Sequence, residues 1–173
     1  MMVSTPRPSD GAAGAAGRLR LRPQTPEDAG FLRLLFGEGR RAEMAAAGWP
    51  EAMAAAFLDD QFRLQSAHYA RAHPDADFRI AERAGRPVGR LAVDWGGDGA
   101  GTGVHVIDIA LRAAVQGRGI GTGLLRQVIA AAGARPVTLQ VVRGARAAGL
   151  YARLGFVACG PAGGVHETLR RVP

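Results

Sequence analysis

The chain of 173 residues has no lysine, and all 22 of its basic residues are arginines. This absence excludes a P-loop nucleotide site, because that motif requires a lysine directly after its last glycine. The net charge of +7 at pH 7 comes from arginines scattered along an Ala- and Gly-rich chain. Scattered arginines favour a nucleic acid partner only weakly and suit a small polyanionic ligand equally well.

The chain has one cysteine, Cys159, so it has no internal disulfide. Cys159 lies in a short apolar run, which predicts a buried and unreactive thiol. No apolar stretch has the length of a signal-peptide core or of a membrane span. A cytoplasmic location without a membrane partner is therefore the default expectation. None of the four histidines has the spacing of a metal site: they are His68, His73, His105 and His166.

Length and composition predict one folded domain. A chain of this size buries a core without disulfides or a structural metal, and its hydrophobic content of 47% is that of an ordinary globular protein. Residues 1–17 are rich in Pro, Ser, Gly and Ala without apolar periodicity, which predicts a disordered tail. Residues 18–173 are expected to form the domain.

The N-terminal part predicts a strand followed by two helices. Leucines and arginines alternate over 18–22, which indicates a half-exposed strand ended by Pro23. Residues 25–28 read Thr-Pro-Glu-Asp, a typical helix N-terminus, and a second helical pattern lies between Pro50 and Pro74.

The remaining residues predict mainly strands. Residues 78–83 and 88–95 are expected to form a hairpin joined by a turn over 84–87. A glycine-rich connection over 94–103 follows. Further strands are predicted over 104–111, 137–142, 156–159 and 165–170, and further helices from 120 to Gly133 and over 145–154.

Residues 116–121 read QGRGIG and stand between a predicted buried strand and an amphipathic helix. Several backbone N–H groups and the helix dipole therefore converge on one spot, which suits a phosphate. Gly119 and Gly121 carry no Cβ that would block close approach, and Arg118 adds positive charge. The segment therefore predicts a pyrophosphate site.

The dinucleotide fingerprint G-x-G-x-x-G does not fit this turn. Started at Gly117 it puts Thr122 at the third glycine, and started at Gly119 it puts Leu124 there. No acidic residue stands about 20 positions further on in either register. Of the three nucleotide sites considered, only an acyl-CoA site remains.

These residues resemble the GNAT acyltransferase superfamily. Its motif A, [RQ]-x-x-G-x-[GA], is matched by Gln116, Gly119 and Gly121, and its motif B is matched by the strand 137–142 and by Tyr151 with the Gly-Phe pair at 155–156. The resemblance implies an α/β (α+β) GNAT fold: a central mixed, mostly antiparallel sheet of six to seven strands flanked by about four helices. The chain departs from the family at Gly144, where asparagine is common, and at Ala113, where proline is common.

The resemblance implies an N-acetyltransferase that transfers an acetyl group from acetyl-CoA to a primary amine of a small molecule, protein or peptide by direct attack. In this family the strand before the turn binds the pantetheine arm of CoA through its backbone, and the turn binds the pyrophosphate. The implied cofactor-binding residues are Ile109, Ala110, Leu111, Gln116, Gly117, Arg118, Gly119, Ile120, Gly121, Thr122 and Gly144.

Two side chains are the candidate catalytic groups. Tyr151 matches the family tyrosine that lies near the thioester sulfur and can protonate the departing thiolate, although a packing role is the alternative. Asp108 stands in an otherwise apolar strand and is the candidate base that removes a proton from the ammonium. A structural ion pair with an arginine explains Asp108 equally well. His105 is the reserve base, and a backbone N–H at Leu111 would polarise the acyl carbonyl.

In this family acceptor specificity comes mainly from the first two helices. The candidate acceptor contacts are Glu43, Trp49, Gln61, Gln65, His68 and Tyr69. A CoA-binding regulatory module with little catalysis, and an acetyltransferase directed at RNA or aminoacyl-tRNA, are the alternative functions. Many members of this family form dimers, so the resemblance is also consistent with a homodimer.

Overall fold

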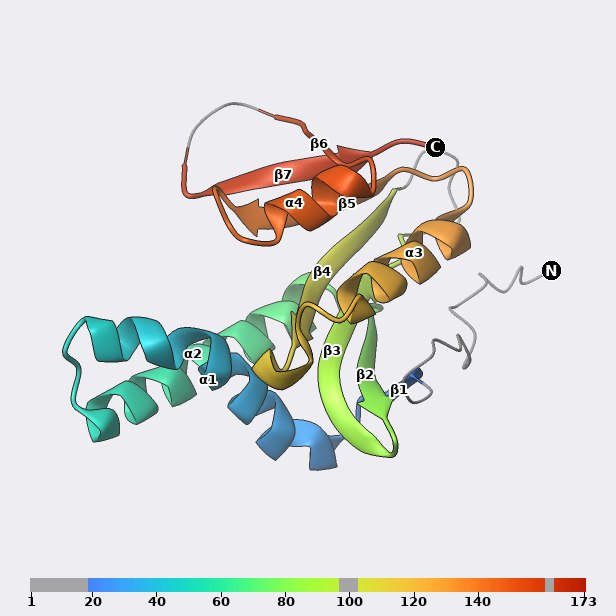
Figure 1. Cartoon of the computed structure of the whole chain (residues 1–173). Coiled ribbons are helices and arrows are strands. Elements are labelled where there is room, and N and C mark those ends of the chain that lie inside the picture. The colour runs from blue at the N-terminus through green and yellow to red at the C-terminus, as the bar shows by residue number, and fades with distance from the viewer. Residues whose placement is uncertain (1–18, 97–102, 161–163) are drawn as a thin grey trace.

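The computed structural model describes residues 19–96, 103–160 and 164–173 (Figure 1). The predicted tail over 1–17 lies outside the described residues, as does most of the glycine-rich connection. The strands are β1 (Leu19–Pro23), β2 (Asp77–Arg83), β3 (Arg86–Asp94), β4 (Val104–Leu111), β5 (Val137–Val142), β6 (Val157–Ala158) and β7 (His166–Arg171). The α-helices are α1 (Ala29–Ala46), α2 (Glu51–Ala72), α3 (Ile120–Ala132) and α4 (Ala148–Arg153), with short 3₁₀ turns at Pro26–Asp28 and Ala113–Val115.

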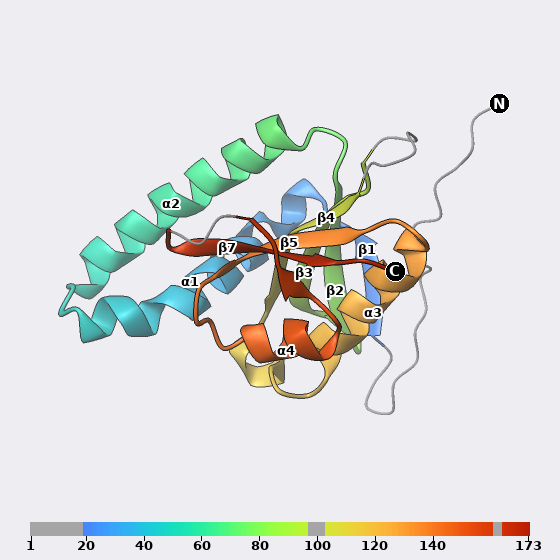
Figure 2. The same ribbon diagram turned by 90° about the horizontal axis from the view of Figure 1, so that it is seen from above.

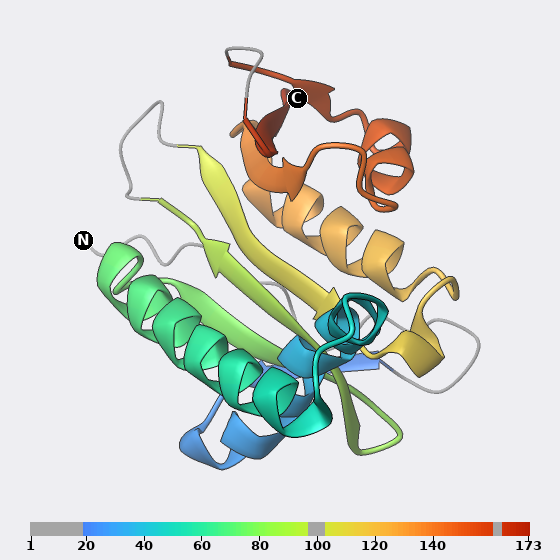
Figure 3. The same ribbon diagram turned by 90° about the vertical axis from the view of Figure 1, so that its left-hand side faces the viewer.

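The strands form one mixed sheet in the order β1-β2-β3-β4-β5-β7-β6. All neighbouring strands are antiparallel except β4 and β5, which are parallel. Helices α1 and α2 cover one face of the sheet, and α3 and α4 cover the other (Figures 2 and 3). The predicted fold class, a mixed and mostly antiparallel sheet of six to seven strands with about four helices, is confirmed, with seven strands and four α-helices among the described residues.

The core is divided between the two faces of the sheet. Apolar side chains of β3, β4 and β5 pack against α3 through Leu124, Leu125 and Val128, all fully buried. On the other face α1 and α2 bury Leu32, Leu35 and Leu58. In α1 and α3 the hydrophobic residues recur at helical spacing, so each of these two helices presents an apolar stripe to the sheet.

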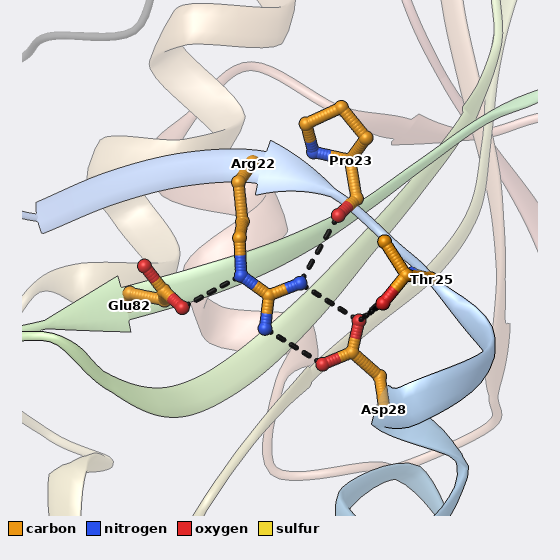
Figure 4. A network of polar contacts seen from close by, with 5 residues as sticks. All are labelled: Arg22, Pro23, Thr25, Asp28 and Glu82. Carbon is orange, nitrogen blue, oxygen red and sulfur yellow. Dashed lines mark hydrogen bonds and ion pairs between the residues drawn. The ribbon is translucent and has the colours of Figure 1, made fainter.

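Arg22 of β1 ties the sheet to the start of α1 (Figure 4). Its Nη1 and Nη2 donate to Asp28 Oδ2 and Oδ1 at 2.7 and 2.6 Å, and its Nε donates to Glu82 Oε1 at 2.6 Å. The Thr25 N–H also donates to Asp28, at 2.8 Å. With Thr25 as the N-cap and Pro26 in the first turn, the helical segment starts where the sequence predicted, as a 3₁₀ turn over 26–28 that continues into the α-helix at Ala29.

The hairpin between β2 and β3 is tighter than predicted. Its turn consists of Ala84 and Gly85 alone, with φ values of 50° and 71° that are typical of a two-residue type I′ turn. Pro87, expected in the turn, belongs to β3 and lies beside a β-bulge, where a missing N–H is tolerated.

Within the part of the chain that the structure describes, no helix combines the length and the apolar character needed to cross a membrane. The cytoplasmic location stays a prediction.

Candidate active site

The parallel strands β4 and β5 separate halfway along β4. They pair only through Val104–Val106 and the facing residues Val137–Leu139, and Figures 1 and 3 show them diverging beyond that point. The Arg112 N–H donates to Val88 on the β3 side. Because backbone groups alternate between the two edges of a strand, those of Ile109 and Leu111 face the opening that β5 leaves. The structure thus gives β4 an open backbone edge.

A β-bulge at Ile107 sets which side chains face which helices. Ala92 pairs with Asp108 and Val93 with Val106, so Ile107 has no partner on β3. As a result Val106 and Ile109 both belong to the core beneath α3. Asp108 and Ala110 line the pocket on the opposite side, beneath α1 and α2.

The open edge of β4 and the Gly-rich turn enclose a pocket of about 530 Å³, called here the turn pocket. Gly117 and Gly119 adopt φ values of 73° and 78°, a conformation that glycine reaches without strain, and α3 begins directly afterwards. Gln116 Nε2 donates to the Leu111 carbonyl at 2.9 Å and holds the turn against the end of β4. The pocket is lined by Ile109, Leu111, Gln116, Gly117, Gly119, Ile120, Gly121, Thr122, Arg146, Ala147, Leu150, Tyr151 and Arg153.

The backbone N–H groups from Gly117 to Thr122 donate no hydrogen bond to any described residue, whereas the next one, Gly123, bonds to the Gly119 carbonyl. Unpaired N–H groups at a helix N-terminus carry partial positive charge and bind anions. Arg146 and Arg153 add full positive charges at the pocket wall. The turn therefore fits a pyrophosphate group, and the two arginines are functional candidates that sequence reasoning missed.

A second pocket, of about 370 Å³, lies on the other side of β4 under α1 and α2 and is called here the helical-hairpin pocket. It shares Ile109, Leu111 and Gln116 with the turn pocket, so the two pockets meet at the end of β4. The lining residues are Leu32, Leu35, Phe36, Glu38, Gly39, Arg40, Phe62, Gln65, Arg90, Asp108, Ile109, Ala110, Leu111, Ala113 and Gln116.

Asp108 lies in the helical-hairpin pocket beside Arg90 of β3. Its Oδ2 is 3.6 Å from Arg90 Nε, and its side chain is 25% exposed. Burial raises the pKa of Asp108, and the charges of Arg90 and Arg40 only partly oppose this shift. The sequence left open whether Asp108 is a base or the partner of an arginine. The structure places Asp108 both beside an arginine and in a pocket.

Tyr151 of α4 lies in the turn pocket across β4 from this pair. Its ring packs edge-on against Phe156, with centroids 6.0 Å apart, and the residue is 6% exposed. Burial raises the pKa of the Tyr151 phenol, and the Asp108 charge raises it further. The hydroxyl therefore stays protonated at neutral pH, and the residue both packs and lines the pocket.

Glu38 of α1 connects the helical hairpin to the segment before the turn. Its carboxylate accepts hydrogen bonds from Arg112 Nε at 2.7 Å and from the Ala113 N–H at 3.2 Å. The Arg112 guanidinium lowers the pKa of Glu38. Glu38 thus connects α1, which lines the helical-hairpin pocket, to the segment that leads into the Gly-rich turn. Nothing local in the sequence of α1 predicts this role.

The structure gathers most of the predicted cofactor residues. Eight of the eleven line the turn pocket. Ala110 lines the helical-hairpin pocket, whereas the exposed Arg118 and Gly144, in the turn after β5, are not among the lining residues of either pocket. Cys159 is partly exposed rather than buried, because it follows the short edge strand β6.

The reserve base His105 lies away from both pockets. It accepts or donates a hydrogen bond with Thr138 Oγ1 at 3.0 Å and stacks on His73. In the described ranges no three His, Cys, Asp or Glu side chains are grouped as metal ligands. Of the predicted acceptor contacts, Gln65 lines the helical-hairpin pocket and the ring of Tyr69 lies beside Arg90. The others are exposed and line neither pocket: Glu43, Trp49, Gln61 and His68.

Comparison with known proteins agrees with this geometry. Residues 74–158 match the family model "Acetyltransferase (GNAT) domain". No curated protein sequence matches the chain. Among solved structures, an acetyltransferase from Thermus thermophilus is similar at 22% identity and a TM-score of 0.63, over 90% of this chain and 97% of that one.

Two further solved structures were determined with CoA compounds. The PaiA N-acetyltransferase from Thermoplasma acidophilum, in complex with coenzyme A, is similar at 16% identity and a TM-score of 0.64, covering 90% of this chain and 99% of that one. RimJ from Mycobacterium smegmatis, in complex with CoA-disulfide, is similar at 18% identity and a TM-score of 0.60, covering 90% and 82%. At these identities the likeness shows the fold.

Proposed function

We propose that this chain is a GNAT acetyltransferase and that it transfers an acetyl group from acetyl-CoA to a primary amine by direct attack. The observation that carries the proposal is the row of N–H groups from Gly117 to Thr122, which donate to no described residue, beside the open edge of β4. The family match supports the reaction class, and this local geometry supports a cofactor site at the turn.

The residues of the turn pocket would hold acetyl-CoA, which supplies the activated acyl group as a thioester. The N–H groups of the turn would bind the pyrophosphate, with Arg146 and Arg153 placed to neutralise phosphate charge. The backbone of Ile109 and Leu111 would pair with the pantetheine arm, as a further strand would. A similar fold solved with coenzyme A supports this assignment.

Two side chains on opposite sides of β4 would move the protons. Asp108 would remove a proton from the ammonium that enters through the helical-hairpin pocket, because an amine attacks only in its neutral form. Tyr151, protonated and in the turn pocket, would deliver a proton to the departing sulfur. An N–H at the end of β4, that of Leu111, would polarise the acyl carbonyl.

The proposal is tested by following free CoA while purified protein is incubated with acetyl-CoA and a panel of amino acids, polyamines and peptides. We expect acceptor-dependent release of CoA, and a kcat lowered by about 100-fold or more in Tyr151→Phe, because one proton donor is lost. Thr168→Val is the matched control, since it removes a hydroxyl of β7 that lines neither pocket.

Calorimetric titration of acetyl-CoA separates the remaining outcomes. Tight binding without release of CoA for any acceptor would support a CoA-binding module instead of a transferase. Absence of acetyl-CoA binding would contradict the whole assignment.

A further inference from the structure

Arg90 is a buried cation that makes no hydrogen bond within the described residues. Its side chain is 7% exposed, and its only close partners there are Asp108 at 3.6 Å and the rings of Tyr69 and Phe78, with centroids 5.3 and 5.4 Å from Cζ. The Nε atom is fully buried without a hydrogen-bond acceptor. A guanidinium has five N–H donors, and burying them unpaired is costly. Arg90 lines the helical-hairpin pocket, where a bound anion would accept hydrogen bonds from its Nη groups, whereas the buried Nε faces Asp108.

The other charged side chains described in this pocket form no hydrogen bond with Arg90, so an anion can bind there. Glu38 is already engaged by Arg112 and the Ala113 N–H. Arg40, the second arginine of the lining, lies over the Phe36 ring at 3.9 Å and donates to a backbone carbonyl. Two cations therefore face Asp108, which among the described lining residues is the one carboxylate without a hydrogen-bonded arginine.

The rest of the lining is apolar. One wall is built from side chains of α1 and α2 that carry no hydrogen-bonding groups: Leu32, Leu35, Phe36 and Phe62. A ligand that places its polar end at Arg90 and Asp108 therefore has a hydrophobic surface for its remaining atoms.

We propose that the acceptor is a free α-amino acid with an apolar side chain, whose carboxylate binds Arg90 and whose amino group faces Asp108; the proposal rests on the proposed function. An α-amino acid carries its amine and carboxylate on neighbouring carbons, which matches the adjacency of Asp108 and Arg90. A planar carboxylate accepts two parallel hydrogen bonds from a guanidinium, so Nη1 and Nη2 of Arg90 would both gain an acceptor.

The reaction balances with these groups. The ammonium first gives one proton to Asp108, and the neutral amino nitrogen then forms a bond to the acetyl carbon as the carbon–sulfur bond breaks. The sulfur receives a proton from Tyr151, and the second proton lost by the nitrogen restores the Tyr151 phenol, while Asp108 releases its proton to solvent. The acceptor carboxylate is unchanged and serves only for binding. A peptide has no free carboxylate beside its N-terminal amine, so peptides should be poor acceptors.

The experiment compares L-leucine with L-leucinamide and 3-methylbutylamine, which keep the amine and the apolar group and lack the carboxylate. We expect kcat/KM for leucine to exceed those of the two neutral-ended amines by about 100-fold or more, because a site built for a polar group rejects analogues without it. Arg90→Met should remove this preference, mainly through KM, and Arg90→Lys should restore part of it. Arg63→Met, at an exposed arginine of α2, is the matched control and should keep the preference.

Acetyl-CoA binding by each variant, measured by calorimetry, verifies that the fold and the turn pocket are intact. Equal turnover of leucine and leucinamide would overturn the inference while leaving the transferase assignment in place. A preference for O-phosphoethanolamine over leucine, or an equal loss of all three rates in Arg90→Met, would overturn it in the same way. Absence of acetyl-CoA binding would instead remove the proposed function and this inference together.

Discussion

Two buried arginine–aspartate pairs stand in opposite situations. In the pair of Arg22 and Asp28, every oxygen of the carboxylate accepts a hydrogen bond, and Glu82 accepts another from the same guanidinium. In the pair of Arg90 and Asp108, the closest approach is 3.6 Å and the guanidinium makes no hydrogen bond within the described residues. The first pair satisfies its own hydrogen-bonding groups, whereas the second leaves the guanidinium without an acceptor among the described residues.

The two aspartates show the same difference in their acidity. Hydrogen bonds from Arg22 lower the pKa of Asp28 to about 2. Burial raises the pKa of Asp108 despite its arginine neighbour. A nearby opposite charge therefore does not by itself decide the acidity of a carboxyl group; direct hydrogen bonds and solvent access decide it here. The first aspartate is suited to hold structure, and the second to exchange a proton.

The largest expected effect is that of Asp108→Asn on catalysis. The amide cannot take a proton from the ammonium, so kcat/KM should fall by about 100- to 10,000-fold. In the wild-type enzyme the pKa that governs the acid limb of the kcat/KM profile should lie above the usual pKa range of aspartates, because burial raises the pKa of Asp108. Initial rates over a pH series measure both. A profile unchanged by the substitution would assign the base elsewhere.

The next effect is that of Asp28→Asn on stability. The pKa of about 2, against about 3.9 in an unfolded chain, corresponds to roughly 2 to 3 kcal/mol of the free energy of unfolding at pH 7. Urea denaturation should show a loss of this size, with kcat of the folded variant unchanged. Asp60→Asn, at an exposed ion pair, should shift the midpoint little. Equal losses in both variants would contradict the structural role of Arg22 and Asp28.

The stability that Asp28 contributes should also depend on pH. Its pKa is lowered by folding, so the contribution is fully present above the unfolded value of about 3.9 and is lost as pH falls through about 2. The difference in unfolding free energy between wild type and Asp28→Asn should therefore shrink between about pH 4 and pH 2. Denaturation curves at three acidic pH values measure it, and a constant difference would be inconsistent with this pKa.

The smallest expected effect is that of Arg90→Met on stability. The substitution removes a buried guanidinium that makes no hydrogen bond within the described residues, and Asp108 can take up a proton in its absence. The free energy of unfolding should therefore fall by less than it does in Asp28→Asn. Urea denaturation of the variant measures this change. A loss as large as that of Asp28→Asn would make the second pair structural and would remove the contrast between them.

The sequence predicted the turn pocket better than the helical-hairpin pocket. The turn is continuous in the chain, so the glycines at 117, 119 and 121 and the strand before them could be recognised together. Arg90 could not be recognised, because its position beside Asp108 depends on the register of β3 with β4 and on the bulge at Ile107. Such long-range pairing is not visible in local periodicity.

The helices show the same limit. Their apolar periodicity predicted α1 and α2, but which polar residues face the pocket depends on how the hairpin lies on the sheet. Glu38 and Arg40 line the pocket, whereas Trp49 and His68, chosen for their chemistry alone, are exposed. The start of the first helical segment, by contrast, was predicted correctly, because its signals, the Thr25 N-cap and Pro26, are local.

The central claim is that the N–H groups from Gly117 to Thr122 bind the pyrophosphate of CoA, and amide NMR spectra recorded during a titration with CoA test it most directly. We predict that the largest shifts fall on these amides and on those of Ile109 and Leu111, while the amides around Arg22 and Asp28 stay unchanged. Saturable binding with unshifted turn amides, or no binding, would contradict it.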